Sequence, residues 1–293
     1  GFFDSKDLSS KKCLINYYIK RVRVNYQLLE TQNIIGKTIE QARLIGIEFY
    51  SVLYRGSQYK VESFLIRLCK SESFLLISPS HKQVRDQKAL ECIPLVMEPS
   101  SAFYNSPLLV LDFQSLYPSI VMAYNYCYST MLGRVQTLGL KDNHIGTTTI
   151  DIPPDLLTLI SDYVTVSPNG IAFVKKELRK SILAKMLKDI LATRFLMKDT
   201  MNQLKDDHDV VSMLDNRQAA LKLLANVTYG YTAASFSGRM PCSDIADSIV
   251  QTGRETLERA IEFIESTKKW GAKVVYGDTD SLFVYLPGKS RSD

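Results

Sequence analysis

Two short apolar segments near the end of the sequence flank an acidic turn, and this arrangement constrains the fold more than any other feature. Residues 273–276 and 281–286 have the composition of strands, and Gly277-Asp278-Thr279-Asp280 lies between them. Glycine and aspartate favour tight turns, so the sequence predicts an antiparallel β-hairpin with carboxylates at its tip. A third acid, Asp112, follows an apolar run at residues 108–111, which we expect to be a strand buried on both faces.

The three acids predict a site for divalent cations if the strand before Asp112 pairs with the hairpin. Asp278 and Asp280 lie two residues apart, so their like charges crowd, and crowded carboxylates are tolerated when they share a cation. An ionised carboxylate at the exit of a buried strand also needs a compensating charge. Two cations held in this way would suit an in-line attack on a phosphorus atom. Taken alone, each feature also fits an ordinary turn or cap.

The remaining segments predict an α+β fold, in which an antiparallel β-sheet is combined with helices. Two long helices, at about residues 175–205 and 212–227, are separated by a polar turn and predict an antiparallel helical hairpin. Pro and Gly make residues 79–106 loop-rich and residues 133–170 an irregular insertion. Apolar periodicity predicts further helices near residues 14–30, 38–50, 120–126 and 244–267, and a helix followed by a strand within residues 59–78.

Composition narrows the function classes only slightly. The chain of 293 residues has a formal net charge of +5 and a pI of about 8.8, which fits a polyanion-binding protein without requiring one. No segment approaches the roughly 18–20 apolar residues of a membrane span, so we expect no membrane partner. The five cysteines are scattered without a CxxC pair, which predicts free, mostly buried thiols in a reduced compartment. The sequence starts at Gly1, and an internal start would hide any targeting segment.

Three strings in the chain resemble the signature motifs of family B DNA polymerases. DFQSLYPSI at residues 112–120 resembles motif A, and YGDTDS at residues 276–281 resembles motif C. Between them, a finger-helix pattern K-x3-N-x2-YG is matched by Lys222, Asn226, Tyr229 and Gly230. One such string is moderately specific, whereas three in the family order are very specific. The resemblance implies a polymerase palm with an antiparallel sheet, joined to fingers made of a long helical hairpin.

Further stretches resemble the zeta branch of this family, among them residues 225–232, 236–242 and 267–272. Delta-type enzymes usually have Asn-Ser where this chain has Asn226-Val227. The zeta resemblance implies translesion synthesis in DNA replication and repair, a nuclear location, and accessory polymerase subunits as partners. The alternatives are a replicative delta-like polymerase and a non-catalytic nucleic-acid-binding module derived from a polymerase.

The resemblance also implies roles for the motif residues. Asp112 and Asp280 would be the main ligands of two Mg²⁺ ions, with Asp278 as a third carboxylate and the backbone carbonyl of Phe113 as a further ligand. Tyr117 would be the steric gate that excludes ribonucleotides. The nucleotide-binding residues would be Ser115, Leu116, Tyr117, Arg179, Lys222 and Asn226. The residues beside the primer–template DNA would be Gly238, Arg239, Tyr276 and Gly277.

By the same resemblance, residues 1–50 are the tail of an exonuclease-like domain, and residues 51–174 are the first part of the palm. Residues 175–230 are the fingers, and residues 231–293 complete the palm. The thumb, and a C-terminal cysteine-rich region with an iron–sulfur cluster, would lie outside this chain, so an isolated fragment of this extent need not be active. Arg21 stands where the family's last exonuclease motif has a metal-binding aspartate, and a cation cannot replace that ligand, so we expect no proofreading.

Overall fold

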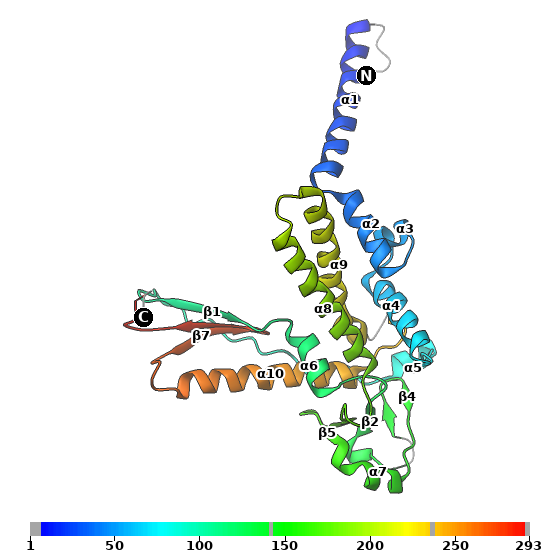
Figure 1. Cartoon of the computed structure of the whole chain (residues 1–293), viewed down its shortest axis with the longest axis vertical. Helices are drawn as coiled ribbons and strands as arrows, with labels where there is room; N and C mark the ends of the chain where they lie inside the picture. Colours follow the sequence, from blue (N-terminus) through cyan, green and yellow to red (C-terminus); the bar gives the residue numbers. More distant parts are fainter. Residues whose placement is uncertain (1–6, 141–142, 235–237, 291–293) are drawn as a thin grey trace. The chain divides into compact units, whose positions relative to one another are not determined.

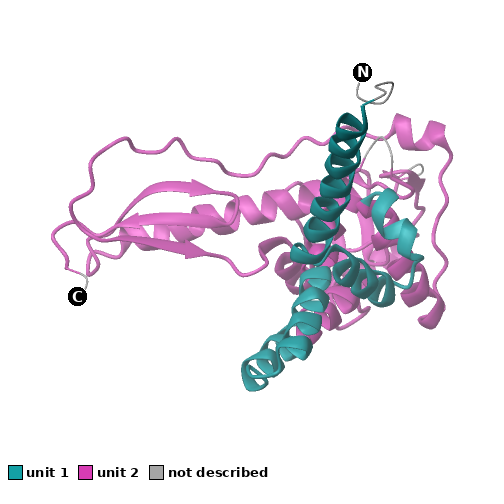
Figure 2. Ribbon diagram, turned by 90° about the horizontal axis from the view of Figure 1, so that it is seen from above, with its two compact units in different colours: residues 1–56, 194–221 teal, residues 57–193, 222–293 magenta. Residues whose placement is uncertain are grey.

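The structure is a computed structural model that describes residues 7–140, 143–234 and 238–290. It divides into two compact units, one of residues 1–56 and 194–221 and the other of residues 57–193 and 222–293 (Figure 2). Helices α8 (Ile182–Gln203) and α9 (His208–Ala233) contribute residues to both units. Helices combined with small antiparallel sheets confirm the predicted α+β class (Figure 1).

The first unit is entirely helical in its described part. It contains α1 (Leu8–Thr31), α2 (Ile34–Ile45), α3 (Phe49–Tyr54) and the adjoining halves of α8 and α9. An ion pair joins Arg217 of α9 to Glu40 of α2, and Arg43 lies 3.1 Å from the other oxygen of Glu40. Because Glu40 is buried, the two arginines supply the compensating charge that a desolvated carboxylate needs.

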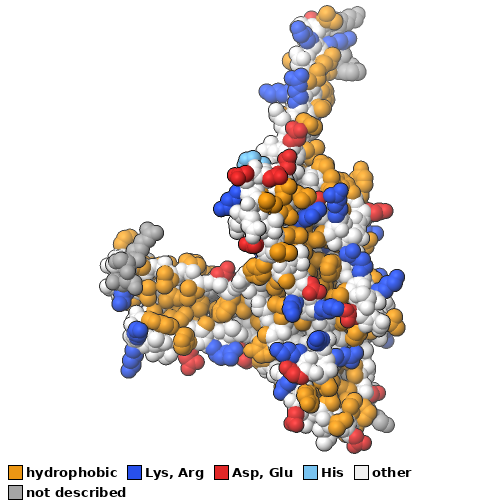
Figure 3. Space-filling view, in the orientation of Figure 1, with side chains coloured by type: hydrophobic (Ala, Val, Ile, Leu, Met, Phe, Trp, Pro, Cys, Tyr) orange, Lys and Arg blue, Asp and Glu red, His pale blue; other side chains and the backbone are white. Residues whose placement is uncertain are grey.

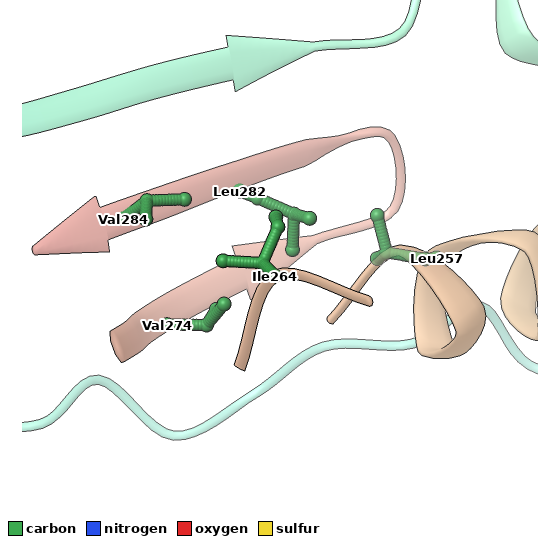
Figure 4. Packing of buried hydrophobic residues seen from close by; sticks show 5 residues of the cluster. All are labelled: Leu257, Ile264, Val274, Leu282 and Val284. Carbon is green, nitrogen blue, oxygen red and sulfur yellow. The ribbon is translucent and has the colours of Figure 1, made fainter. Parts of the chain in front are cut away.

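The main sheet of the second unit has three antiparallel strands in the order β1 (Leu108–Asp112), β8 (Ser281–Tyr285) and β7 (Lys273–Asp278). Helix α10 (Ser243–Ser266) packs on one face of this sheet. The register of β7 against β8 shifts between Val274 and Tyr276. Figure 4 shows the apolar cluster between helix and sheet, which consists of Leu257, Ile264, Val274, Leu282 and Val284.

The rest of the second unit consists of shorter helices and strands. A second sheet has the order β2-β6-β5, and β3 pairs with β4. Phe173 of β6 is fully buried, and its ring centroid lies 4.4 Å from that of Tyr126. The elements are α4 (Ser57–Ser71), α5 (His81–Asp86), α6 (Leu116–Tyr124), β2 (Met131–Arg134), η1 (Val135–Thr137), β3 (His144–Ile145), β4 (Thr148–Thr149), α7 (Pro154–Ile160), η2 (Ser161–Tyr163), β5 (Val164–Val166) and β6 (Ile171–Val174).

The prediction that residues 108–111 are buried on both faces is wrong. Leu108 is 38% exposed and Val110 is 59% exposed. The reason is that β1 is an edge strand with β8 as its one strand neighbour in the sheet, while the buried cluster lies against β7 and β8. Hydrophobic side chains are accordingly visible over the part of the surface that carries this sheet (Figure 3).

Other boundaries also differ from the sequence-based expectations. The segment after α4 forms no strand, residues 79–106 include helix α5, and the insertion at residues 133–170 contains several short helices and strands. The first fingers helix begins at Ile182 rather than near residue 175. The two compact units do not test the predicted exonuclease, palm and fingers boundaries, which stay predictions.

All five cysteines are free thiols, and Cys69, Cys127 and Cys242 are buried, as predicted. None of the described helices combines the length and the apolar character needed to cross a membrane.

Candidate active site

The strand register brings the predicted acids to one end of the main sheet. Ser281 of β8 is the cross-strand partner of Asp112 on one side and of Asp278 on the other. The backbone N–H of Phe113 donates a hydrogen bond of 2.8 Å to the carbonyl of Asp280. The strand before Asp112 therefore pairs with the acidic hairpin, which is the condition on which the predicted cation site depends.

Asp112 and Asp278 belong to the sheet face opposite α10. Directly paired residues of an antiparallel sheet point to the same side. Leu282 and Val284 of β8 pack toward α10, so the alternate residue Ser281 belongs to the other face, together with its partners Asp112 and Asp278. This face carries the carboxylates and the other carries the core, which leaves the acids accessible to a ligand.

The turn between the two motif C acids is held in an uncommon conformation. Thr279 has φ 55°, which is unfavourable for a β-branched residue, and its N–H donates to the carbonyl of Leu95 at 2.9 Å. Its hydroxyl lies 2.8 Å from Oδ1 of Asp278. Val96 also forms an isolated bridge with Asp278. Residues 95–97 thus line the β7 edge of the sheet, a contact that the sequence analysis missed because these residues were assigned to a loop.

The surroundings of Asp280 disfavour the ionised form of its carboxyl group. Burial raises the pKa of this carboxyl, and the neighbouring charges of Asp112 and then Asp278 raise it further, while a backbone hydrogen bond opposes them. Within the described residues, no three or more His, Cys, Asp or Glu side chains are grouped so as to hold a metal ion. The carboxylates fit Mg²⁺ nevertheless, because Mg²⁺ is usually bound by one or two carboxylates together with water and substrate phosphates.

The residues after motif A turn sharply from the strand into α6. Ser115 precedes the helix in the left-handed region, with φ 52°, and its carbonyl accepts the N–H of Ser119 at 2.9 Å. Leu116 is buried and anchors the first turn, whereas Tyr117 is half-buried. Burial raises the pKa of the Tyr117 phenol, and the charges of Asp280 and Asp278 add to this effect. The tyrosine therefore lies in the electrostatic field of the acids.

Helix α9 approaches this tyrosine through Tyr229. The two ring centroids are 4.7 Å apart and the ring planes are inclined by 52°. Burial, followed by the influence of Tyr117, raises the pKa of Tyr229 to about 12. Lys222 and Asn226 are exposed on the same helix, and their spacing to each other and to Tyr229 places all three on one helical face.

The remaining predicted residues have varied surroundings. Arg179 is exposed just before α8, with its guanidinium carbon 5.2 Å from the Phe74 ring centroid. Arg239 forms an ion pair with Glu62 of α4. The Tyr276 hydroxyl lies 3.5 Å from Oδ2 of Asp278. The string resembling the zeta branch at residues 236–242 is only partly described, since Phe236 and Ser237 lie outside the described residues and Gly238 follows them.

Gly277, predicted to lie beside DNA, is also a packing position. A Cβ there would lie 2.9 Å from Cδ2 of Leu282 and 3.0 Å from Sδ of Met97. The absence of a side chain thus lets residues 95–97 approach β7 closely.

A buried acid that the sequence analysis did not select supports this region from α10. Asp247 is 5% exposed and accepts backbone N–H groups from Glu91 at 3.1 Å and Cys92 at 3.0 Å. It holds the segment that leads to Leu95. Its sequence neighbours gave no signal of this role, because the contact joins residues more than 150 positions apart.

Comparison with known proteins agrees with these features. The family model described as DNA polymerase family B matches residues 47–293. The DNA polymerase zeta catalytic subunit of Saccharomyces cerevisiae is 63% identical over 286 residues, which cover 97% of this chain and 19% of that protein. The DNA polymerase delta catalytic subunit of Arabidopsis thaliana is 34% identical over 283 residues, which cover 94% of this chain and 24% of that protein.

A solved family B DNA polymerase from Pyrobaculum calidifontis matches with a TM-score of 0.66 and 28% identity, covering 96% of this chain and 33% of that one. The chain spans about a fifth of the yeast relative's length. Together, the motif geometry, the family model and this structural likeness confirm the predicted resemblance: the chain belongs to DNA polymerase family B.

Proposed function

We propose that this chain is the catalytic core of a zeta-type DNA-directed DNA polymerase, which transfers nucleotides from dNTPs to a primer 3′-hydroxyl. The observation that carries the proposal is the strand register, which places Asp112 and Asp278 on either side of Ser281. The carbonyl of Asp280 accepts a hydrogen bond from the N–H of Phe113, the residue after Asp112. The greater identity to a zeta than to a delta catalytic subunit supports translesion synthesis over replicative, delta-like synthesis.

Family B polymerases generally use divalent metal ions, and the acids of this chain are the proposed ligands. Asp112 and Asp280 would be the principal ones, with Asp278 and the Phe113 carbonyl as further oxygen donors. Two Mg²⁺ ions bound there would neutralise phosphate charge and favour ionisation of the primer hydroxyl. Burial, together with repulsion from Asp112 and Asp278, raises the pKa of Asp280, and this supports the assignment because a cation between the acids would relieve the repulsion.

The chain's own residues would bind and orient the nucleotide. The backbone N–H groups of Ser115 and Leu116, at the start of α6, would donate to phosphate oxygens. Tyr117 would lie under the sugar and leave no room for a 2′-hydroxyl. The exposed Lys222 and Asn226 of α9, with Arg179, would contact the triphosphate.

Primer–template DNA is the proposed macromolecular substrate. Gly238, Arg239, Tyr276 and Gly277 are the proposed neighbours of the primer terminus, and backbone contacts there would hold DNA without sequence preference. A nuclear location, accessory polymerase subunits, and an iron–sulfur cluster outside this chain remain proposals derived from the zeta resemblance.

Substitution of the acids tests catalysis directly. We expect Asp112→Asn and Asp280→Asn, in the complete gene product, to lower primer extension at least about 100-fold, because a metal contact contributes several kcal/mol to the transition state. Primer–template binding, measured by fluorescence anisotropy, should persist. Asp155→Asn on the exposed face of α7 is the matched control. Wild-type extension by both site variants would refute the assignment and leave a non-catalytic DNA-binding module as the explanation.

The lack of proofreading is a separate proposal. Arg21 lies on α1 with its guanidinium carbon 5.7 Å from the Tyr17 ring centroid, and a guanidinium cannot ligate a metal ion. We expect the complete protein to show no 3′→5′ degradation of a labelled primer in the absence of dNTPs. Degradation that disappears when the exonuclease-like domain is mutated would contradict this expectation. Lesion-bypass and misincorporation assays on the same protein separate zeta-type from delta-like synthesis.

A further inference from the structure

A glycine in the middle of α10 lies directly against the first turn of α6. Figure 1 shows the two helices close together, and they are in contact. Gly253 is buried, and a Cβ built on it would lie 3.2 Å from Cε1 of Tyr117. The same Cβ would lie 3.4 Å from Cδ1 of Ile120 and 3.5 Å from Cδ2 of Leu116. The contact with the tyrosine ring is thus the tightest of the three.

Two of the three neighbours of this glycine are fixed in place by burial. Leu116 and Ile120 are 6% and 4% exposed, which fixes the turn that carries Tyr117. The Tyr229 ring lies 4.7 Å from that of Tyr117, centroid to centroid, and provides a further contact. A methyl group at position 253 would therefore displace the tyrosine ring by a few tenths of an ångström rather than find empty space.

Glycine is also an unfavourable residue in a helix interior. It costs about 1 kcal/mol of helix stability relative to alanine, so local helix formation does not account for it here. Close approach of another group to the backbone does account for it. The group that approaches is the ring proposed to select the sugar.

We propose that Gly253 is a positioning residue for sugar selection. Because it has no side chain, it sets how closely the Tyr117 ring packs against α10. The inference rests on the proposed polymerase function and on Tyr117 as the steric gate. Gly253 touches no substrate and acts through the ring alone. An added methyl group would push the ring away from α10. With the sugar bound over the ring, as proposed, this shift narrows the space for a 2′-hydroxyl, so that it would be excluded more strictly.

The test is the ratio of kcat/KM for a dNTP to that for the matching rNTP, measured by single-nucleotide primer extension with the complete gene product. A misplacement of reacting groups by 1 Å lowers the reaction rate about 100-fold, so a shift of the ring by about 0.3 Å corresponds to about a fourfold change in this ratio. We expect Gly253→Ala to raise the ratio by about this factor. Gly56→Ala is the control, because nothing lies within 4 Å of the position of its added Cβ.

Two further backgrounds separate positioning from a general structural effect. The effect of Gly253→Ala should persist with Tyr117→Phe, which keeps the ring, and disappear with Tyr117→Ala, which removes it. A merely structural role would lower kcat for both sugars and leave the ratio unchanged in every background. An unchanged or lower ratio in Gly253→Ala overturns the proposal.

Failure of the underlying assumption gives a different result. If Tyr117→Ala does not relax sugar selection while dNTP extension continues, Tyr117 is not the gate and the proposal for Gly253 is refuted along with it. If Tyr117→Ala relaxes selection and Gly253→Ala has no effect on the ratio, only the positioning role is refuted.

Discussion

Removal of the Asp247 carboxylate should loosen the segment that supports the motif C turn. Asp247 accepts the N–H groups of Glu91 and Cys92, and the chain continues from there to Leu95, whose carbonyl accepts the N–H of Thr279. One carboxylate on α10 therefore anchors residues 91–97, and these residues hold the turn that carries Asp278 and Asp280. We expect Asp247→Ala to reduce both stability and activity.

The magnitude follows from the hydrogen bonds and from burial. A hydrogen bond to a charged group contributes about 1.5–3 kcal/mol, and Asp247→Ala removes two such bonds. The freed N–H groups of Glu91 and Cys92 lie in a partly exposed segment, so water will replace part of the lost hydrogen bonding. The expected loss in the free energy of unfolding is therefore about 3 kcal/mol. Asp247→Asn retains one carbonyl oxygen as an acceptor, so we expect about half that loss.

Urea denaturation followed by circular dichroism measures the free energy of unfolding, and primer extension measures activity. Glu258→Gln is the matched control on the same helix, because Glu258 makes a solvent-exposed ion pair with Arg254 at 2.9 Å. Such a pair contributes at most about 1 kcal/mol. The reasoning would be refuted if Asp247→Ala lost no more stability than Glu258→Gln, or if Asp247→Asn were more damaging than Asp247→Ala.

Two other predictions concern stability. Burial raises the pKa of the Cys242 thiol to about 12 from an ordinary value of 9.0, so the unfolded chain loses this proton at a lower pH than the folded chain does. The free energy of unfolding should therefore fall between about pH 9 and 12, by at most about 1.4 kcal/mol per pH unit. Cys242→Ala should flatten this slope in alkaline denaturation curves, and an equal flattening by Cys13→Ala would count against the explanation. Glu40→Gln should destabilise the helical unit by about 2 kcal/mol, because it removes the buried negative charge that pairs with Arg217. Hydrogen exchange of the backbone amides in α2 measures this loss, and unchanged protection there would contradict the prediction.

The sequence was sufficient to predict the parts of the site that depend on local pattern. The turn residues at 277–280 predicted a hairpin and the apolar run before Asp112 predicted a strand, and the structure has both. The i, i+4 spacing of Lys222 and Asn226 predicted a shared helical face, and α9 provides it. Each of these predictions depends on spacings of only a few residues, for which the backbone geometry is fixed.

The parts that could not be predicted depend on long-range packing. An apolar run such as residues 108–111 indicates a strand but not what covers it, and here the strand is an exposed edge. The segment at residues 95–97 has two prolines nearby and reads as a loop, although it pairs with β7. Asp247 and Gly253 are separated from their partners by more than 130 positions, so no local pattern marks them.

The register shift in β7 bears on which insertions and deletions this chain can tolerate. Val274 pairs with Val284 and Tyr276 pairs with Phe283, so Val275 is one extra residue relative to β8. Deleting Val275 would remove the bulge and restore regular alternation, while Tyr276, Gly277 and Asp278 would keep their partners Phe283, Leu282 and Ser281. Asp278 would then stay on the face away from α10. The bulge is therefore the point at which β7 can change its length by one residue without moving its acid, and a homologue shortened there with an intact YGD string would keep the site.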